Sequence, residues 1–293
     1  MNFPDIYSKI QEHMAATLAL AAIGAELRLR QNGLDGDPRM RDTLQTLVAQ
    51  FVPPDALDSL EPGQLAMLAG QVSYSLQEGL DLIREPERAP GWTYTDPSVL
   101  QERGRGSRSA ALSFRSMAQT RPALKAILEN DCRFLDVGTG VGWLSIQAAQ
   151  LWPKMQIVGL DIHEPALKLA EANISESGLS DRIALRKQSI TALGSDGLYN
   201  LVWFPSMFMP EFVVRQALPL IYQALAPDGM LIFAMFAPAP GPYGETTRDL
   251  LTVRSGGHPW SLPDLEALLS ATGFRNLEFV NSGATACTML AQR

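Results

Sequence analysis

The stretch 134-FLDVGTGVGWLS-145 sets a run of apolar residues directly before three alternating glycines and a helix-forming segment. The apolar run predicts a buried strand, and Gly138, Gly140 and Gly142 fall in the turn from this strand to the helix. Glycine permits positive φ and leaves no side chain between the backbone and a ligand. The turn therefore predicts a site for a ligand that lies against the backbone.

From Asp131 onward, strands and helices alternate along the chain. The pattern predicts helices at 142–152, 164–178, 211–225 and 261–273, and strands at 133–138, 155–162, 182–188, 198–204, 229–236, 274–280 and 286–292. Continuous apolar strands that alternate with helices are typical of a parallel sheet covered on both faces. The predicted fold class is α/β.

The first part of the chain is predicted to be helical. Apolar positions recur at helical spacing from residue 4 to about 84, which indicates roughly four helices. Residues 85–97 contain three prolines and a glycine and are expected to form a linker, followed by two or three more helices. We expect an all-helical domain over 1–125, which caps the substrate, and a sheet domain over 126–293.

Composition argues against several classes of partner. The formal charge is 24 minus 31, or -7, with no run of Lys or Arg, so nucleic acid is not expected. The apolar stretch 14–23 is about half the length needed to cross a bilayer, so no membrane is expected. Cys132 and Cys287 have neither metal nor redox spacing, which favours a cytoplasmic protein without a metal site.

A second feature indicates a nucleoside ligand. Asp161 ends the next predicted strand, 161 minus 136, or 25, residues after Asp136. A carboxylate there can bind both hydroxyls of a ribose, and Ile162 can lie against a flat base. A dinucleotide is disfavoured, because Trp143 stands where its fingerprint needs a third glycine.

With "LDVGTGVG" at 135–142 and "GLDI" at 159–162, the chain resembles the class I S-adenosylmethionine (SAM) dependent methyltransferases, in particular bacterial small-molecule enzymes with a helical N-terminal cap. The resemblance implies a Rossmann-like seven-stranded sheet whose last strand is antiparallel. It also implies that the methionyl part of SAM is held by Asp136, Gly138, Thr139, Gly140 and Gly142, and the ribose by Asp161. Many members have an acidic residue at the adenine, whereas "KQSI" offers Gln188 and Ser189.

The segment 204-FPSMFMPE-211 follows the fourth predicted strand. It differs from the Asn-Pro-Pro-Tyr of enzymes that methylate bases or glutamine. Phe204 beside the cofactor, with Met207 and Phe208 toward the substrate, would form an apolar wall next to the methyl group. Such a wall favours a small, partly apolar substrate, although simple packing of a strand end explains the same residues.

Candidate catalytic residues lie in 252-TVRSGGHPWS-261. His258 could act as a base, Arg254 could pair with a substrate carboxylate, and Trp260 could contact the substrate. Two glycines would give this loop freedom to close. Alternatively, Arg254 and His258 only fix a surface loop.

Two aromatic residues in the linker are further candidates. Trp92 could contact the substrate and Tyr94 the reacting sulfonium, because aromatic faces attract cations. Gln101 and Ser107 could add polar contacts. Alternatively, the aromatic pair fastens the helical region to the sheet domain.

The predicted function is methyl transfer from SAM to a small-molecule acceptor held between cap and sheet domain, in an enzyme that could form a homodimer. Two alternatives stay open. The enzyme could release methylthioadenosine, by ring closure or aminocarboxypropyl transfer, or the protein could bind SAM as a regulator without turnover.

Overall fold

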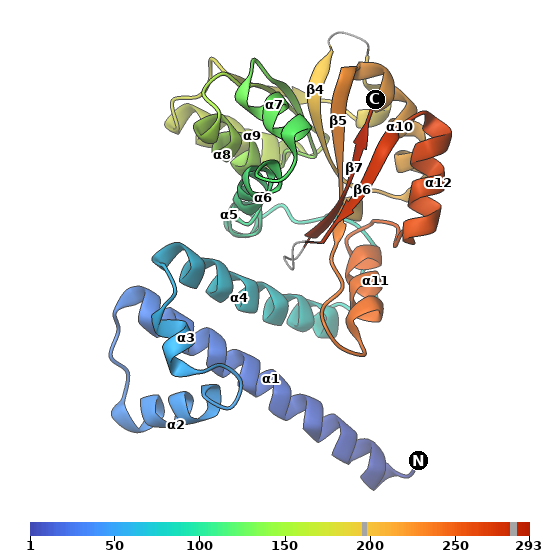
Figure 1. The fold of residues 1–293 in the computed structure, drawn as a ribbon. Helices are drawn as coiled ribbons and strands as arrows, with labels where there is room; N and C mark the ends of the chain where they lie inside the picture. Colours follow the sequence, from blue (N-terminus) through green and yellow to red (C-terminus); the bar gives the residue numbers. More distant parts are fainter. Residues whose placement is uncertain (195–197, 282–285) are drawn as a thin grey trace. The chain divides into compact units, whose positions relative to one another are not determined.

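The computed structural model describes residues 1–194, 198–281 and 286–293 (Figure 1). The chain divides into two compact units, Met1–Arg88 and Ala89–Arg293. In the part of the chain that the structure describes, no helix is long and apolar enough to cross a membrane.

The first unit consists of four helices, as predicted. They are α1 (Phe3–Asn32), α2 (Pro38–Val48), α3 (Pro54–Asp58) and α4 (Pro62–Arg84). A proline stands at the first or second position of each, where its missing N–H costs no hydrogen bond. The shared core of these helices is small and includes Ala22, Leu27 and Ala69.

The second unit begins with the linker and three helices, α5 (Pro97–Arg105), α6 (Arg108–Ala118) and α7 (Pro122–Glu129). The expected boundary at residue 125 therefore differs from the observed division, which falls inside the predicted linker. The reason is packing: Phe114 of α6 and Leu124 of α7 are buried in the same core cluster as Phe134 of the first strand. These three helices lie with the sheet.

The sheet has seven strands in the order β3-β2-β1-β4-β5-β7-β6. Their bounds are β1 (Arg133–Val137), β2 (Gln156–Asp161), β3 (Ile183–Lys187), β4 (Tyr199–Pro205), β5 (Leu225–Phe236), β6 (Arg275–Val280) and β7 (Ala286–Gln292). β7 runs antiparallel to β5 and β6, while β1 to β5 pair in parallel. The predicted class, an α/β Rossmann-like sheet with an antiparallel last strand that follows N-terminal helices in the chain, is confirmed.

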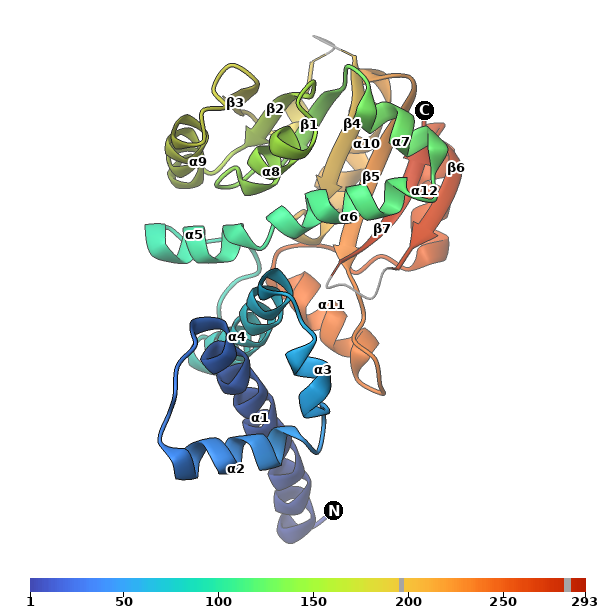
Figure 2. The same ribbon diagram turned by 60° about the vertical axis from the view of Figure 1, so that its left-hand side comes forward.

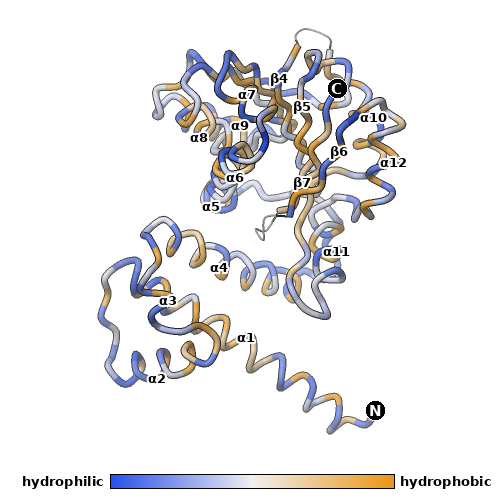
Figure 3. The backbone as a smooth tube through the Cα atoms, in the orientation of Figure 1, coloured by the Kyte–Doolittle hydropathy of each residue, from blue (hydrophilic) through white to orange (hydrophobic). Residues whose placement is uncertain are grey.

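Helices cover both faces of this sheet (Figure 2). One core cluster joins α6, α7, α8 (Trp143–Leu151) and α9 (Glu164–Glu176) to the sheet, and the other joins α10 (Glu211–Ala224) and α12 (Leu262–Thr272). Apolar residues are concentrated along β4, β5 and β7 (Figure 3). Two faces buried at once explain why the strands carry continuous apolar runs.

The sequence analysis did not predict α-helix α11 (Gly244–Arg254). This helix lies in the connection between β5 and α12. Its sequence, GETTRDLLTVR, contains threonines and has only a weak apolar stripe, so periodicity did not indicate it. The helix matters because the following loop carries His258.

Candidate active site at the carboxyl edge of the sheet

The glycine turn joins β1 to α8 and has the backbone conformation that the sequence required. Gly138, Gly140 and Gly142 have φ values of 67°, 57° and 84°. A Cβ on Gly140 would come no closer than 4.0 Å to another group, so the space above it is open. In addition, the Thr139 N–H donates to the Leu160 carbonyl at 2.9 Å, which joins the turn to β2.

Asp136 lies beneath this turn and is only 1% exposed. Its Oδ2 accepts hydrogen bonds from the hydroxyls of Thr139 at 2.8 Å and Ser145 at 2.7 Å. Burial raises the pKa of Asp136 to about 6. These hydrogen bonds stabilise the turn. The predicted contacts of Asp136 and Thr139 with the methionyl part of SAM stay predictions.

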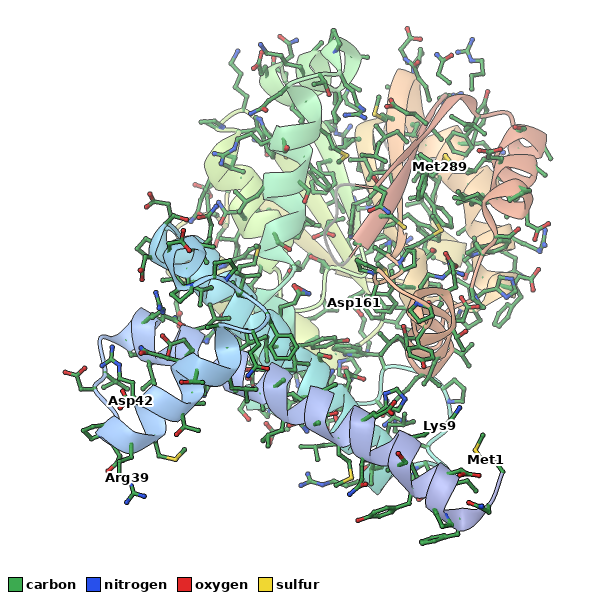
Figure 4. All side chains as sticks on the ribbon, turned by 60° about the horizontal axis from the view of Figure 1, so that its bottom comes forward. Met1, Lys9, Arg39, Asp42, Asp161 and Met289 are labelled. Carbon is green, nitrogen blue, oxygen red and sulfur yellow. The ribbon has the colours of Figure 1, made fainter. Side chains whose placement is uncertain are left out.

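Asp161, which is labelled in Figure 4, ends β2 at the same edge of the sheet. Its Oδ2 accepts from the Gly140 N–H at 2.8 Å, and its Oδ1 accepts from the His163 N–H at 2.8 Å. Each oxygen keeps acceptor capacity for a hydroxyl group. Ile162 beside it is 70% exposed, unusual for a large apolar side chain and suited to cover a flat base. These residues fit the nucleoside of SAM.

The end of β3 adjoins this site, because the Gln188 N–H donates to the Asp161 carbonyl at 2.9 Å. The Gln188 side chain donates to the Ala192 carbonyl at 2.7 Å, and Ser189 Oγ lies 2.8 Å from the Thr191 hydroxyl. The predicted adenine contacts of Gln188 and Ser189 stay predictions.

The side chain of Phe204 is fully buried in the core and packs against Phe233, with ring centroids 5.6 Å apart. The predicted contact of Phe204 with the cofactor stays a prediction. β4 turns this side chain inward, which is the packing alternative that the sequence left open.

Helix α5 contacts the residues around the glycine turn through a hydrogen-bond network. Gln101 Oε1 accepts from the indole Nε1 of Trp143 at 2.9 Å, and Gln101 Nε2 donates to Asn173 at 2.9 Å. Asn173 in turn donates to the Val141 carbonyl at 2.8 Å. Gln101 was expected to contact the ligand, but in the structure its side chain belongs to this network. The Ser107 hydroxyl, in the turn between α5 and α6, donates to the Gly104 carbonyl in α5.

The predicted aromatic residues of the linker meet the apolar wall. Trp92 contacts Tyr94 and Phe208 edge to face, with centroids 5.2 and 5.4 Å apart. The guanidinium of Arg103 lies 4.2 Å from the centroid of Tyr94. This cation already occupies one face of Tyr94, so the predicted contact of Tyr94 with a sulfonium stays a prediction.

A pocket of about 500 Å³ lies beyond the end of β5, and we call it the β5–α11 pocket. Its walls come from η2 (Ser206–Phe208), the end of β5, α11 and residues 258–263, and they include Met207, His258 and Trp260. The structure thus brings three predicted site residues together. Phe208, Trp92, Tyr94 and Arg254 are outside the described lining.

His258 has a carboxylate partner that the sequence analysis missed. Its Nδ1 lies 3.6 Å from Glu211 Oε2, and the side chain is 38% exposed. Glu211 also pairs with Arg215 at 2.6 Å, and the Trp260 ring packs edge to face on His258 at 4.6 Å. Glu211 lies at the start of α10, far in the sequence from His258, which follows α11. No local sequence pattern could have linked the two residues.

The two glycines before His258 have a different role from the one expected. A Cβ on Gly256, whose φ is 90°, would lie 2.9 Å from the Gly91 Cα, and a Cβ on Gly257 would overlap the Met207 backbone. These glycines permit close packing and fix the loop, so the expected freedom to close is corrected. Arg254 is 8% exposed, and its backbone carbonyl accepts from the Gly91 N–H at 3.0 Å; the predicted pairing of its guanidinium with a substrate carboxylate stays a prediction.

The cofactor turn and the β5–α11 pocket share one wall. A Cβ built on Gly138 would lie 3.5 Å from Pro205 Cγ and 3.9 Å from Met209 Cε. Ser206 and Met207, between those two residues, line the pocket. The segment after β4 therefore faces the glycine turn with some residues and the pocket with others. This arrangement suits transfer of a group between two neighbouring ligands.

Comparisons with known proteins support this interpretation. Residues 128–253 match the family model described as a methyltransferase domain. The demethylmenaquinone methyltransferase of Thermus thermophilus is 31% identical over 117 residues, which span 40% of this chain and 53% of that protein. The ribosomal protein L11 methyltransferase of Trichlorobacter lovleyi is 36% identical over 50% of this chain and 43% of its own length. The chain thus spans about half or less of these relatives.

Two solved structures share the fold over nearly the whole chain. The pyocyanin biosynthetic protein PhzM aligns over 100% of both chains with a TM-score of 0.66 and 17% identity. Human N-acetylserotonin methyltransferase, solved with SAM, covers 98% of this chain and 97% of its own with a TM-score of 0.59 and 14% identity. The glycine turn and Asp161 both lie inside the matched residues 128–253, so this part of the chain is a methyltransferase domain, and its sheet has the fold of the two solved methyltransferase-like structures.

Proposed function

We propose that this protein transfers the methyl group of SAM to a small-molecule acceptor bound in the β5–α11 pocket. The observation that carries the proposal is the shared wall, since Pro205 and Met209 adjoin Gly138 while Ser206 and Met207 line the pocket. Two ligands held on either side of this segment meet at the end of β4. Alignment of two reactants in a dry site supplies much of the rate of a displacement reaction.

The residues of the cofactor side bind and orient. The glycine turn leaves room for the methionyl part, Asp161 accepts the ribose hydroxyls, and Ile162 covers the base. Bound SAM supplies a methyl group made electrophilic by its sulfonium. Asp136, Thr139 and Ser145 keep the turn in place through buried hydrogen bonds.

On the acceptor side His258 is the proposed base. Glu211 near Nδ1 orients the ring and leaves Nε2 to take the proton of an acceptor hydroxyl or amine. The ion pair with Arg215 holds Glu211 at the start of α10. Trp260 against the ring limits its rotation. Met207 and Phe236 offer apolar surface to the body of the acceptor.

The names of similar proteins support a small acceptor. PhzM is named for pyocyanin biosynthesis and the human enzyme for N-acetylserotonin, and both align with nearly the whole chain. Other similar proteins are named for ribosomal proteins, but their alignments span half of this chain or less. A cytoplasmic location, a bacterial source, a cap that closes over the substrate and a homodimer stay predictions.

The proposal is tested by incubation of the purified protein with SAM, first alone and then with a panel of hydroxylated and amine-bearing ring compounds, and by mass spectrometry of the products. We expect S-adenosylhomocysteine together with a product 14 mass units heavier than the acceptor, which is the mass that methylation adds. Methylthioadenosine formed without an acceptor would replace the proposal with ring closure. Binding of SAM without consumption across the panel would favour a regulator.

A further inference from the structure

The charged groups of the β5–α11 pocket carry information about the acceptor. The pocket walls are mostly apolar and include Met235, Phe236, Leu262 and Phe279. Arg248 is the one Lys or Arg residue among its described lining residues, so it decides how the pocket treats an anionic group.

The guanidinium of Arg248 is already paired with two carboxylates of its own helix. Its Nη1 lies 2.5 Å from Glu245, while its Nη2 and Nε donate to Asp249 Oδ1 at 2.6 and 2.9 Å. These interactions use the planar fork that would otherwise grip a ligand carboxylate. A carboxylate-bearing acceptor would have to displace one of them.

The sum of these charges is negative. Glu245 and Asp249 contribute two negative charges against the single positive charge of Arg248. Glu211, outside the described lining but near the lining residue His258, is paired with Arg215. Arg254 is buried outside the lining and has an interaction partner of its own. The four residues 282–285 that precede Cys287 are Ser, Gly, Ala and Thr, which are uncharged.

From these contacts we infer that the pocket selects acceptors that are uncharged or cationic, with a flat apolar body, and rejects carboxylated ones. The inference rests on the proposed function and narrows its substrate class. Aromatic and methionine walls bind the ring, and the surplus carboxylate favours a protonated amine over a carboxylate on the same ring. Glu245 is the specificity-determining residue, because it both neutralises Arg248 and supplies negative charge at the wall.

The test uses three probes that differ only in charge: 1-naphthylmethylamine, 1-naphthylmethanol and 1-naphthoate. Each is titrated by calorimetry at pH 7 into the full-length protein saturated with S-adenosylhomocysteine. We expect the amine to bind about tenfold more tightly than the carboxylate, with the alcohol between them. The Glu245→Gln variant should bring this ratio close to one, because it removes the surplus charge and frees one edge of Arg248.

Two further variants serve as controls. Glu171→Gln makes the same charge change on an exposed position of α9, away from the pocket lining, and should keep the ratio of the unaltered protein. Leu262→Trp enlarges an exposed lining residue and should weaken all three probes, which locates them in the pocket.

The possible failures are distinct. If naphthoate bound as tightly as the amine or more tightly, the charge selection would be overturned, but the proposed location of the acceptor in the pocket would not. Binding of none of the probes, or binding that Leu262→Trp leaves unchanged, would overturn the inference together with the proposed place of the acceptor. Binding of S-adenosylhomocysteine, measured in the same instrument beforehand, is independent of both outcomes and reports on the cofactor site alone.

Discussion

At the scale of single residues, the burial of Asp136 makes stability depend on pH. Its folded pKa of about 6 lies above the ordinary value of 3.8, so the folded protein binds this proton more tightly than the unfolded chain. Stability due to this group is therefore present below about pH 4 and is lost as the pH rises through 6. Two pKa units correspond to about 3 kcal/mol. In urea denaturation, the free energy of unfolding of Asp136→Asn should not show this decrease between pH 4 and pH 7.

The matched control is Asp181→Asn, which neutralises an exposed carboxyl. Its free energy of unfolding should decrease between pH 4 and pH 7 as much as that of the unaltered protein. The asparagine at position 136 retains an oxygen that can accept from Thr139 and Ser145, so the turn is preserved. A pH dependence in Asp136→Asn equal to that of the unaltered protein would contradict the assignment.

His258 is the second residue whose role can be measured. With the acceptor found in the screen, His258→Gln should lower kcat by roughly a hundredfold or more and abolish the rise of rate with pH, because the proposed base is lost. Affinity for S-adenosylhomocysteine should stay the same. His13→Gln, an exposed change in α1, should leave both quantities unaltered. An unchanged pH profile in His258→Gln would mean that His258 only fixes its loop.

At the scale of elements, the loop that follows α11 is fixed by close backbone contact. Gly257→Ala places a Cβ onto the Met207 backbone and should displace the loop, at a cost of about 1–3 kcal/mol in stability. Thermal and urea denaturation measure this cost. Acceptor KM should rise, while affinity for S-adenosylhomocysteine stays within about twofold, because the glycine turn belongs to β1 and α8. Gly63→Ala in α4 meets no atom within 4 Å and should be tolerated.

A change in helix α5, in contrast, should affect binding of the cofactor and not of the acceptor. Gln101→Leu removes the partner of the partly buried Trp143 Nε1 and one partner of Asn173, and this loss should cost about 1–3 kcal/mol in stability. Because Asn173 holds the Val141 carbonyl, calorimetry should also show weaker binding of S-adenosylhomocysteine. Gln101→Glu keeps the acceptor for Trp143 and should be affected less. Equal affinity in all three proteins would show that α5 does not support the turn.

At the scale of the whole molecule, the cofactor site belongs to one unit. The glycine turn, Asp161 and the α5 hydrogen-bond network all lie in Ala89–Arg293, which has its own large core. A fragment of residues 89–293 should therefore melt cooperatively and bind S-adenosylhomocysteine within about threefold of the full chain. Differential scanning calorimetry and titration check this. A fragment that does not fold would show that the first unit completes the core of the second.

The sequence by itself determined the fold class and the cofactor side of the site. Strand and helix periods are local, so the seven strands and most helices could be read from patterns of burial. The glycines at 138, 140 and 142 take the positive φ of the turn, and the carboxylate at 161, the proposed ribose ligand, contacts this turn from the end of the next strand. Both features follow from their place at strand ends. For this reason they could be found without coordinates.

Only the tertiary structure decided the acceptor side. It paired His258 with Glu211, turned Phe204 into the core, made close-packed contacts of Gly256 and Gly257, and assigned α5–α7 to the sheet unit. Each of these depends on contacts between segments far apart in the chain. The side chain that a residue meets there is set by packing over the whole molecule, and no local period or spacing encodes it.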